Sequence, residues 1–183
     1  VAANPAEDLQ APRAVAALPR FLSLDDVDAL LSAPDTSTPR GVRDRTLIEV
    51  LYATGLRVSE LVGLRVTDVR ADQGYVQCLG KGRKQRSVPL WRSTVKAVRA
   101  WLRVNPQFEA TSPLLPNRNG REMTRSNVTK RLILAARAAA SQHPRLTKQR
   151  VSPHMIRHTT AMHLLQAGVD ISVIALWLGH ESP

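Results

Sequence analysis

Helix start and stop signals recur along almost the whole sequence, and this feature restricts the fold most. Ser23 and Ser152-Pro153 precede apolar residues at helical spacing, and Gly55 and Gly179 directly follow two further patterns of this kind. Serine favours a helix start because its side chain binds unsatisfied N–H groups, and glycine favours the left-handed stop. We therefore predict helices that begin after Ser23, near Arg43, near Val58, at about Ser93, at Thr124, at Ser152 and after Asp170, with a loop from Pro34 to Pro39.

One segment departs from this helical pattern. Tyr75–Leu79 and Arg86–Leu90 are short, strand-like runs that flank the glycine-containing segment Gly80-Lys81-Gly82-Arg83-Lys84. This arrangement is typical of a β-hairpin. We predict a mainly α fold with one small antiparallel β-hairpin, which is an α+β class. Residues 1–20 contain three prolines without clear periodicity and are predicted to be a linker or N-terminal tail, while residues 21–183 form one domain.

The charge of the chain indicates an anionic partner. Of 183 residues, 26 are Lys or Arg and 15 are Asp or Glu, so the formal net charge is +11. A folded domain this basic repels itself unless an anion shares its surface, and nucleic-acid phosphate is the commonest such anion. An anionic membrane surface or a ribosomal partner would satisfy the same charge. No stretch approaches the roughly 18 apolar residues of a membrane span, and no apolar region suits a signal peptide.

Several residues are predicted to serve packing alone. Cys78 is the single cysteine and lies in an apolar run, which indicates a buried thiol, no intrachain disulfide and a reducing compartment. The other packing candidates are Tyr52, Tyr75, Trp91, Trp101, Trp177, His158 and His163.

Arg57 is the first basic residue at a structurally special place. It follows the predicted helix stop at Gly55 and precedes the helix start near Val58. Free N–H groups and the positive end of the helix dipole make such a position favourable for an anion. A surface ion pair with Glu60, one turn later, explains the residue equally well.

The predicted hairpin tip gathers further cations. Lys81, Arg83, Lys84 and Arg86 lie within a few residues of one another, beside glycines that let the backbone approach a ligand closely. The order of residues differs from that of a P-loop, and no helix follows directly. The tip therefore suits a DNA backbone better than a nucleotide pocket, and a solvated basic turn is the alternative.

The helix after Ser152 carries the third basic group. His154 and Arg157 are three residues apart and share one helix face near its start, and His180 directly follows the predicted stop at Gly179. A cation in the first turn costs about 0.3–1 kcal/mol against the helix dipole unless an anion is bound nearby. A zinc site is the alternative, because His158 lies four residues after His154. The glutamate of the H-E-x-x-H pattern is absent and Arg157 would adjoin the metal, so we predict no metal.

Three segments in this order resemble the catalytic domain of the tyrosine recombinases, the phage-integrase and Xer-type enzymes. They are ATGLRVSEL (53–61), GKGRKQRSVPL (80–90) and SPHMIRHTTAMHLLQAGVDISVIALWLGH (152–180), and the resemblance extends from about Phe21 to the last residue. It implies the fold of that catalytic domain. By position, Arg57 and Arg157 match the two catalytic arginines, Lys81 the hairpin lysine, and His154 and His180 the two histidines.

The resemblance also implies a mechanism without a metal ion or cofactor. The two guanidiniums would hold the non-bridging oxygens of a DNA phosphate while a tyrosine forms a 3′-phosphotyrosyl link. Lys81 would act as general acid on the departing 5′ oxygen, His154 would handle the proton of the nucleophile, and His180 would donate a hydrogen bond. That tyrosine follows the second histidine, whereas this sequence ends at Pro183. We therefore expect a catalytic (DNA breaking-rejoining) domain over 21–183 that is truncated before its nucleophile and inactive alone.

The expected partner is double-stranded DNA, with no membrane. The residues predicted to follow the DNA backbone are Arg83, Lys84, Arg86, Arg121, Arg125 and Lys130. The resemblance implies a cytoplasmic, DNA-associated bacterial protein that is tetrameric on DNA at full length, whereas the fragment is expected to be monomeric. One alternative is a nuclease-dead DNA-binding module or regulator that keeps the fold without a nucleophile. A type IB topoisomerase-like enzyme, which shares the pocket chemistry, is the third interpretation.

Overall fold

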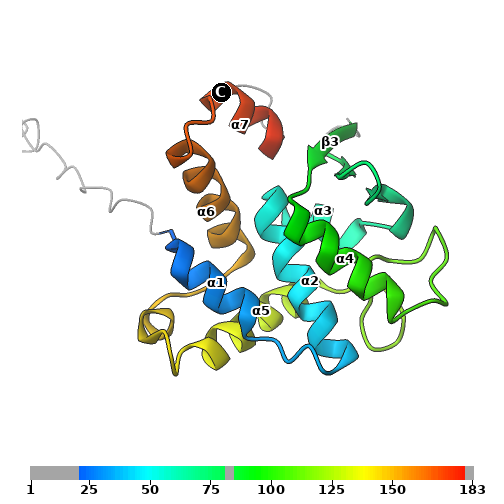
Figure 1. Cartoon of the computed structure of the whole chain (residues 1–183), viewed down its shortest axis with the longest axis horizontal. Coiled ribbons are helices and arrows are strands. Elements are labelled where there is room, and N and C mark those ends of the chain that lie inside the picture. Colours follow the sequence, from blue (N-terminus) through cyan, green and yellow to red (C-terminus); the bar gives the residue numbers. More distant parts are fainter. Residues whose placement is uncertain (1–20, 81–84, 180–183) are drawn as a thin grey trace, which may run out of the picture.

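A computed structural model of the chain describes residues 21–80 and 85–179 and shows a helical domain with one small sheet (Figure 1). The α-helices are α1 (Leu24–Ser32), α2 (Pro39–Thr54), α3 (Val58–Gly63), α4 (Arg92–Arg103), α5 (Arg125–Ala139), α6 (Pro153–Gln166) and α7 (Ile171–Leu178). The strands are β1 (Val69–Arg70), β2 (Tyr75–Leu79) and β3 (Gln85–Pro89), and two 3₁₀ turns are η1 (Val66–Asp68) and η3 (Pro144–Lys148). The predicted α+β class is confirmed. The predicted linker, residues 1–20, lies outside the described residues.

The helix ends confirm most of the predicted signals. Ser23 and Asp26 form a reciprocal capping box at α1, and the Ser152 hydroxyl accepts the Met155 N–H at 3.2 Å at the start of α6. Gly55 and Gly179 end α2 and α7 in the left-handed region, at φ 58° and 71°.

Helix α2 begins four residues earlier than predicted. Its first residue is Pro39, which the sequence placed in a loop, and the hydroxyl of Thr38 accepts the Gly41 N–H at 3.1 Å. Proline suits the first helical position because its missing N–H has no partner there in any case. The loop prediction failed because proline is also a common loop residue.

The predicted hairpin is confirmed and gains a third strand. Strands β2 and β3 pair antiparallel, with Val76 opposite Val88 and Cys78 opposite Arg86. Val76 and Val88 are fully buried, so this face of the sheet packs on the helices. Strand β1 pairs with β2 through two residues only, which is too short for a periodic pattern to reveal.

Helix α2 forms the centre of the core. It packs against α1, α4 and α6, and Leu47, Leu51 and Ile156 are fully buried among them. A second, smaller apolar cluster of Leu164, Ile174 and Leu178 lies between α6 and α7. Helix α7 thus reaches the domain mainly through its own cluster, and Figure 1 shows it (red) at one end of α6 (orange).

The aromatic residues divide between core and surface. Trp101 is buried and donates its indole N–H to the Leu114 carbonyl at 2.7 Å, as predicted for a core residue. Trp91 was predicted in the core, which is wrong: its side chain is 36% exposed and its ring covers the edge of Tyr52, with the ring centroids 5.0 Å apart. Tyr52 is buried, and its hydroxyl lies 2.7 Å from Nδ1 of His163, which confirms packing roles for both.

Cys78 is expected to react slowly with thiol reagents in the folded chain. Its thiol is buried, and burial raises its pKa from 9.0 to about 11, so the reactive thiolate is scarce at pH 8. We expect labelling at pH 8 about 100-fold slower than in the unfolded chain, where the ordinary pKa returns. The measurement is the release of a chromogenic thiol with and without denaturant. Equal rates would contradict the buried position.

None of the helices in the described ranges combines the length and apolar character that crossing a bilayer requires.

Candidate functional site

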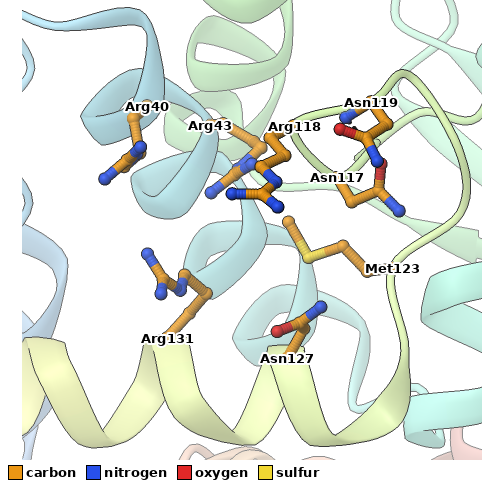
Figure 2. Close-up of a pocket in the computed structure, with 8 residues that line it drawn as sticks. All are labelled: Arg40, Arg43, Asn117, Arg118, Asn119, Met123, Asn127 and Arg131. Atoms are coloured by element: carbon orange, nitrogen blue, oxygen red, sulfur yellow. Dashed lines mark hydrogen bonds between the residues drawn. The ribbon is translucent and has the colours of Figure 1, made fainter.

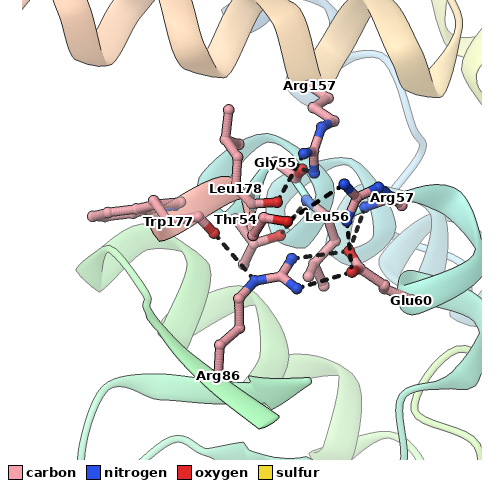
Figure 3. A network of polar contacts seen from close by, with 10 residues as sticks. Thr54, Gly55, Leu56, Arg57, Glu60, Arg86, Arg157, Trp177 and Leu178 are labelled. Carbon is pink, nitrogen blue, oxygen red and sulfur yellow. Dashed lines mark hydrogen bonds and ion pairs between the residues drawn. The ribbon is translucent and has the colours of Figure 1, made fainter. Parts of the chain in front are cut away.

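The ends of α2 and α7 meet at the turn that carries Arg57, and the side chain of Arg157 reaches this place from α6. Gly55 ends α2 with a positive φ, and a Cβ at this position would lie 2.5 Å from the side chain of Leu178. The end of α7 therefore packs directly on this turn, and the start of α3 follows it in the chain. Figure 3 shows the resulting cluster, in which Arg57 and Arg86 meet at Glu60 while Arg157 lies at Gly55 and Leu178.

Arg157 bridges the two helix ends. Its side chain comes from α6, donates to the Gly55 carbonyl at 2.6 Å through Nη1, and donates to the Leu178 carbonyl at 2.8 Å through Nη2. Carbonyls at helix C-termini carry partial negative charge, which suits a buried cation. Burial and, secondly, the neighbouring charge of Arg57 together lower the pKa of Arg157 from 12.5 to about 10. The guanidinium therefore remains charged at neutral pH and is fixed in direction by the backbone.

Arg57 reaches the same place from the N-cap of α3. Its Nη2 donates to the Gly179 carbonyl at 3.4 Å, its Nη1 lies 3.3 Å from Oε1 of Glu60, and its side chain is 40% exposed. The ion pair with Glu60, which the sequence offered as an alternative to an anion site, is thus present. The Glu60 side chain is only 6% exposed, however, so this is an internal pair beneath an accessible guanidinium.

Arg86 lies inside the cluster rather than along the hairpin surface. Its two terminal nitrogens each lie 2.9 Å from one carboxylate oxygen of Glu60, and its Nε donates to the Trp177 carbonyl at 3.3 Å. Arg86 was expected at an exposed hairpin tip, whereas its side chain is only 14% exposed, and its contact with the DNA backbone stays a prediction. The reason for the low exposure is strand alternation: Arg86 and Val88 are two residues apart on β3, so both face inward.

Glu60 is the shared acceptor of the cluster. Burial alone would raise the pKa of its carboxyl, but hydrogen bonds from Arg86 and from the Arg57 backbone N–H, the latter at 2.7 Å, lower the pKa overall. The sequence did not assign Glu60 a role beyond pairing with Arg57. Its i,i+3 spacing from Arg57 and the inward position of Arg86 were the available signals.

Gly179 packs directly against the guanidinium of Arg86. A Cβ at this residue would lie 2.7 Å from Nη1 of Arg86, and its φ is positive, so any other residue would be strained here and would displace the guanidinium. The packing ties β3, α3 and the end of α7 together. In the sequence, β3 follows the predicted Lys81 and α7 precedes the predicted His180.

Of the other predicted catalytic residues, one lies in the described part of the chain and two lie outside it. His154 is exposed in the first turn of α6, three residues before Arg157 on the same helix. Lys81 and His180, and with them the DNA-contact candidates Arg83 and Lys84, lie outside the described residues. The structure thus brings Arg57 and Arg157 together, and the catalytic assignment of all five residues stays a prediction.

Three further DNA-contact candidates lie on the surface near the start of α5. Arg121, Arg125 and Lys130 are all exposed, and Arg125 is the first residue of that helix. Their role in DNA binding stays a prediction.

The charge of the cluster favours an anionic ligand. Arg57, Arg86 and Arg157 together carry three positive charges, and Glu60 supplies one negative charge among them. Within the described ranges, no group of three His, Cys, Asp or Glu side chains is arranged to hold a metal ion. The accessible part of the cluster is the guanidinium of Arg57, held next to that of Arg157 by the carbonyl groups of one turn and one helix end.

Comparison with known proteins agrees with this geometry. The sequence matches the phage integrase family over residues 20–183. A putative integrase/recombinase of Sinorhizobium fredii is 45% identical over 166 residues, which cover 90% of this chain and 50% of that protein. The tyrosine recombinase XerD of Pseudomonas aeruginosa is 41% identical over 190 residues, which cover 99% of this chain and 60% of that protein.

Solved structures show the same fold. The XerA recombinase superposes with a TM-score of 0.78 at 28% identity, covering 91% of this chain and 58% of that chain. The XerH site-specific recombinase, in a pre-cleavage complex with its difH substrate, gives a TM-score of 0.76 at 25% identity. The match covers 94% of this chain and 50% of that chain. The chain spans between half and three fifths of the length of these relatives. A family match over nearly the whole sequence, together with this fold, shows that the chain belongs to the phage integrase family of tyrosine recombinases.

Proposed function

We propose that this chain is the catalytic core of a site-specific tyrosine recombinase, which binds duplex DNA and activates one backbone phosphate for attack by a tyrosine. The observation that carries the proposal is the meeting of Arg57 and Arg157, 100 positions apart in sequence, at the joined ends of α2 and α7. Related proteins of known structure include a recombinase in a pre-cleavage complex with its DNA substrate, which supports the same partner for this chain.

The two arginines suit the charge that develops on a phosphodiester under attack. In the five-coordinate transition state, negative charge gathers on the non-bridging oxygens, and guanidinium forks donate to such oxygens in a planar geometry. Donors that are fixed before the reaction stabilise this charge without a reorganisation cost. The bonds from Arg157 to two backbone carbonyls provide that fixation, and Glu60 orients Arg57.

The remaining roles follow from the family match by position. The tyrosine oxygen forms a bond to phosphorus while the bond to the 5′ oxygen breaks. His154 accepts the proton of the nucleophile, Lys81 donates a proton to the departing 5′ oxygen, and His180 donates a hydrogen bond to the phosphate. His154 is well placed for proton transfer because it is exposed on the helix that carries Arg157.

The nucleophile in this proposal is neither of the two tyrosines of the chain. Tyr52 is buried with its hydroxyl at His163, and Tyr75 begins β2, where it pairs with Arg70 and Pro89 across the sheet. The attacking tyrosine would come from beyond His180, and the whole protein would act as a tetramer on two duplexes. A DNA-binding module without a nucleophile remains the alternative, and covalent attachment of DNA separates the two.

Duplex binding tests the substrate. We expect the chain to bind a duplex of about 30 base pairs with an affinity that falls at least about 100-fold between about 50 and 200 mM salt, because bound phosphates release counterions. Fluorescence anisotropy of labelled DNA measures this dependence.

Variants locate the binding. Arg57→Ala is expected to weaken binding about tenfold, since a charge-assisted hydrogen bond is lost, whereas Arg145→Ala, an exposed change on η3, should alter it less than about twofold. An affinity that does not respond to salt, or equal effects of the two variants, would contradict the proposal.

A further inference from the structure

A second basic cavity lies at the other end of α2 from the arginine cluster described above. Its volume is about 490 Å³, and its wall combines the start of α2, the first turns of α5 and the loop before α5. Figure 2 shows side chains converging on it from these three segments. Four of them are arginines: Arg40, Arg43, Arg118 and Arg131.

The charge of this cavity is only partly balanced from within. Asp44 lies 2.8 Å from Nη2 of Arg43 and 3.5 Å from Nη1 of Arg131, and Arg43 also donates to the Pro116 carbonyl at 3.2 Å. This one carboxylate pairs with two of the four guanidiniums. The surplus of three positive charges in one cavity is unfavourable unless an anion enters it.

The remaining donors of the cavity have no partner in the described part of the chain. The guanidiniums of Arg40 and Arg118 and the side-chain amides of Asn119 and Asn127 make neither hydrogen bonds nor ion pairs with any described residue. Arg43, in contrast, is held in place by Asp44 and Pro116. The cavity therefore has a fixed wall and a set of uncommitted donors, as an anion-binding site requires.

The lining indicates which anion fits. Arginine forks and asparagine amides donate to phosphate oxygens, and the one apolar side chain of the wall is Met123. Among the described lining residues there is no aromatic ring on which a base could stack. A sugar–phosphate backbone is therefore favoured over a nucleotide held by its base.

The position of the cavity relates it to the first site. Arg43 lies near the start of α2 and Gly55 is the residue that caps its end, and twelve residues of helix correspond to about 18 Å. That length equals about five base pairs along B-form DNA. We propose that this cavity binds one backbone phosphate of a DNA duplex while another phosphate of the same duplex lies at Arg57 and Arg157. The inference rests on the proposed function and assigns it a second, non-reacting anchor that sets the register of the DNA.

The test removes the two uncommitted arginines together. The variant Arg40→Ala/Arg118→Ala should leave the thermal unfolding midpoint unchanged, because both side chains are exposed and make no bonds to other described residues. The matched control is Arg92→Ala/Arg103→Ala, which removes the same charge from exposed positions on α4. Binding of both variants to a duplex of about 30 base pairs is measured over a series of salt concentrations.

The expected result is a loss of affinity of at least about tenfold in the cavity variant, and a slope of log affinity against log salt that is smaller by about one, because the contact with one phosphate is lost. The variant Arg40→Lys/Arg118→Lys should restore most of the slope, since it keeps the charge. Equal losses in the cavity and control variants, or lower affinity with an unchanged slope, would overturn the inference and leave the proposed function intact. Failure of the unsubstituted chain to bind DNA would overturn both.

Discussion

Replacement of Arg157 by alanine is expected to reduce covalent attachment of DNA by about 10²–10³-fold, the usual cost of losing one preorganised donor to a developing oxyanion. The experiment requires a longer version of this chain that continues to the tyrosine nucleophile. A duplex with a nick beside the target phosphate traps the covalent product, which is then resolved by denaturing gel electrophoresis. The structural reason is the double role of this residue, which would hold the phosphate and already joins the Gly55 and Leu178 carbonyls.

A graded series separates these roles. Arg157→Lys keeps the charge but can reach only one of the two carbonyls at a time, so an intermediate loss is expected. Arg150→Ala, an exposed change shortly before α6, should leave attachment within about twofold of the unsubstituted chain. Near-normal attachment by Arg157→Ala would show that the reacting phosphate lies elsewhere.

Removal of Arg86 is expected to destabilise the fold by about 3 kcal/mol at neutral pH, in the range found when a buried ion pair loses one partner. In Arg86→Leu, the carboxylate of Glu60 stays buried but loses both of its short hydrogen bonds to the guanidinium. The side chains of the pair are only 14% and 6% exposed, so water cannot replace those bonds. Chemical denaturation at two pH values measures the effect.

The pH dependence identifies the cause. The pKa of Glu60 is lowered in the folded chain, so its ionised form contributes stability above the ordinary value of 4.5, and this contribution is lost as the pH falls through the lowered value. In Arg86→Leu, the remaining effect of burial favours the protonated carboxyl. The deficit of this variant should therefore be largest near pH 7 and shrink towards pH 4. The double variant Glu60→Gln/Arg86→Leu should show a smaller deficit without this dependence. A deficit of equal size at both pH values would assign the loss to packing instead.

Local signals in the sequence predicted the helices well because each signal has its physical cause nearby. Ser23, Ser152, Gly55 and Gly179 act within one turn of themselves, and all four were identified correctly. Arg86 shows where local interpretation failed, since its neighbours suggested an exposed basic tip. Its alternation with the buried Val88 would have placed it inward.

The second basic cavity could not be predicted in this way. Arg40, Arg118 and Arg131 belong to segments about 80–90 positions apart in sequence, and only the packing of α2 with α5 brings them together. For the first site, the resemblance of three segments to a known family predicted that residues distant in sequence lie together, because members of a family share a fold. Without such a match, Arg57 would have remained equally consistent with a surface ion pair.

The way α7 is attached to the domain affects the stability of the arginine cluster. The carbonyls of Trp177, Leu178 and Gly179 receive hydrogen bonds from Arg86, Arg157 and Arg57 respectively, yet α7 is held by its own small apolar cluster. Detachment of this one helix would remove an acceptor from every arginine of the cluster while the main core stayed folded. We therefore expect the arginine cluster to open at a lower free energy than the whole domain unfolds, although Trp177 of α7 also packs against the main core.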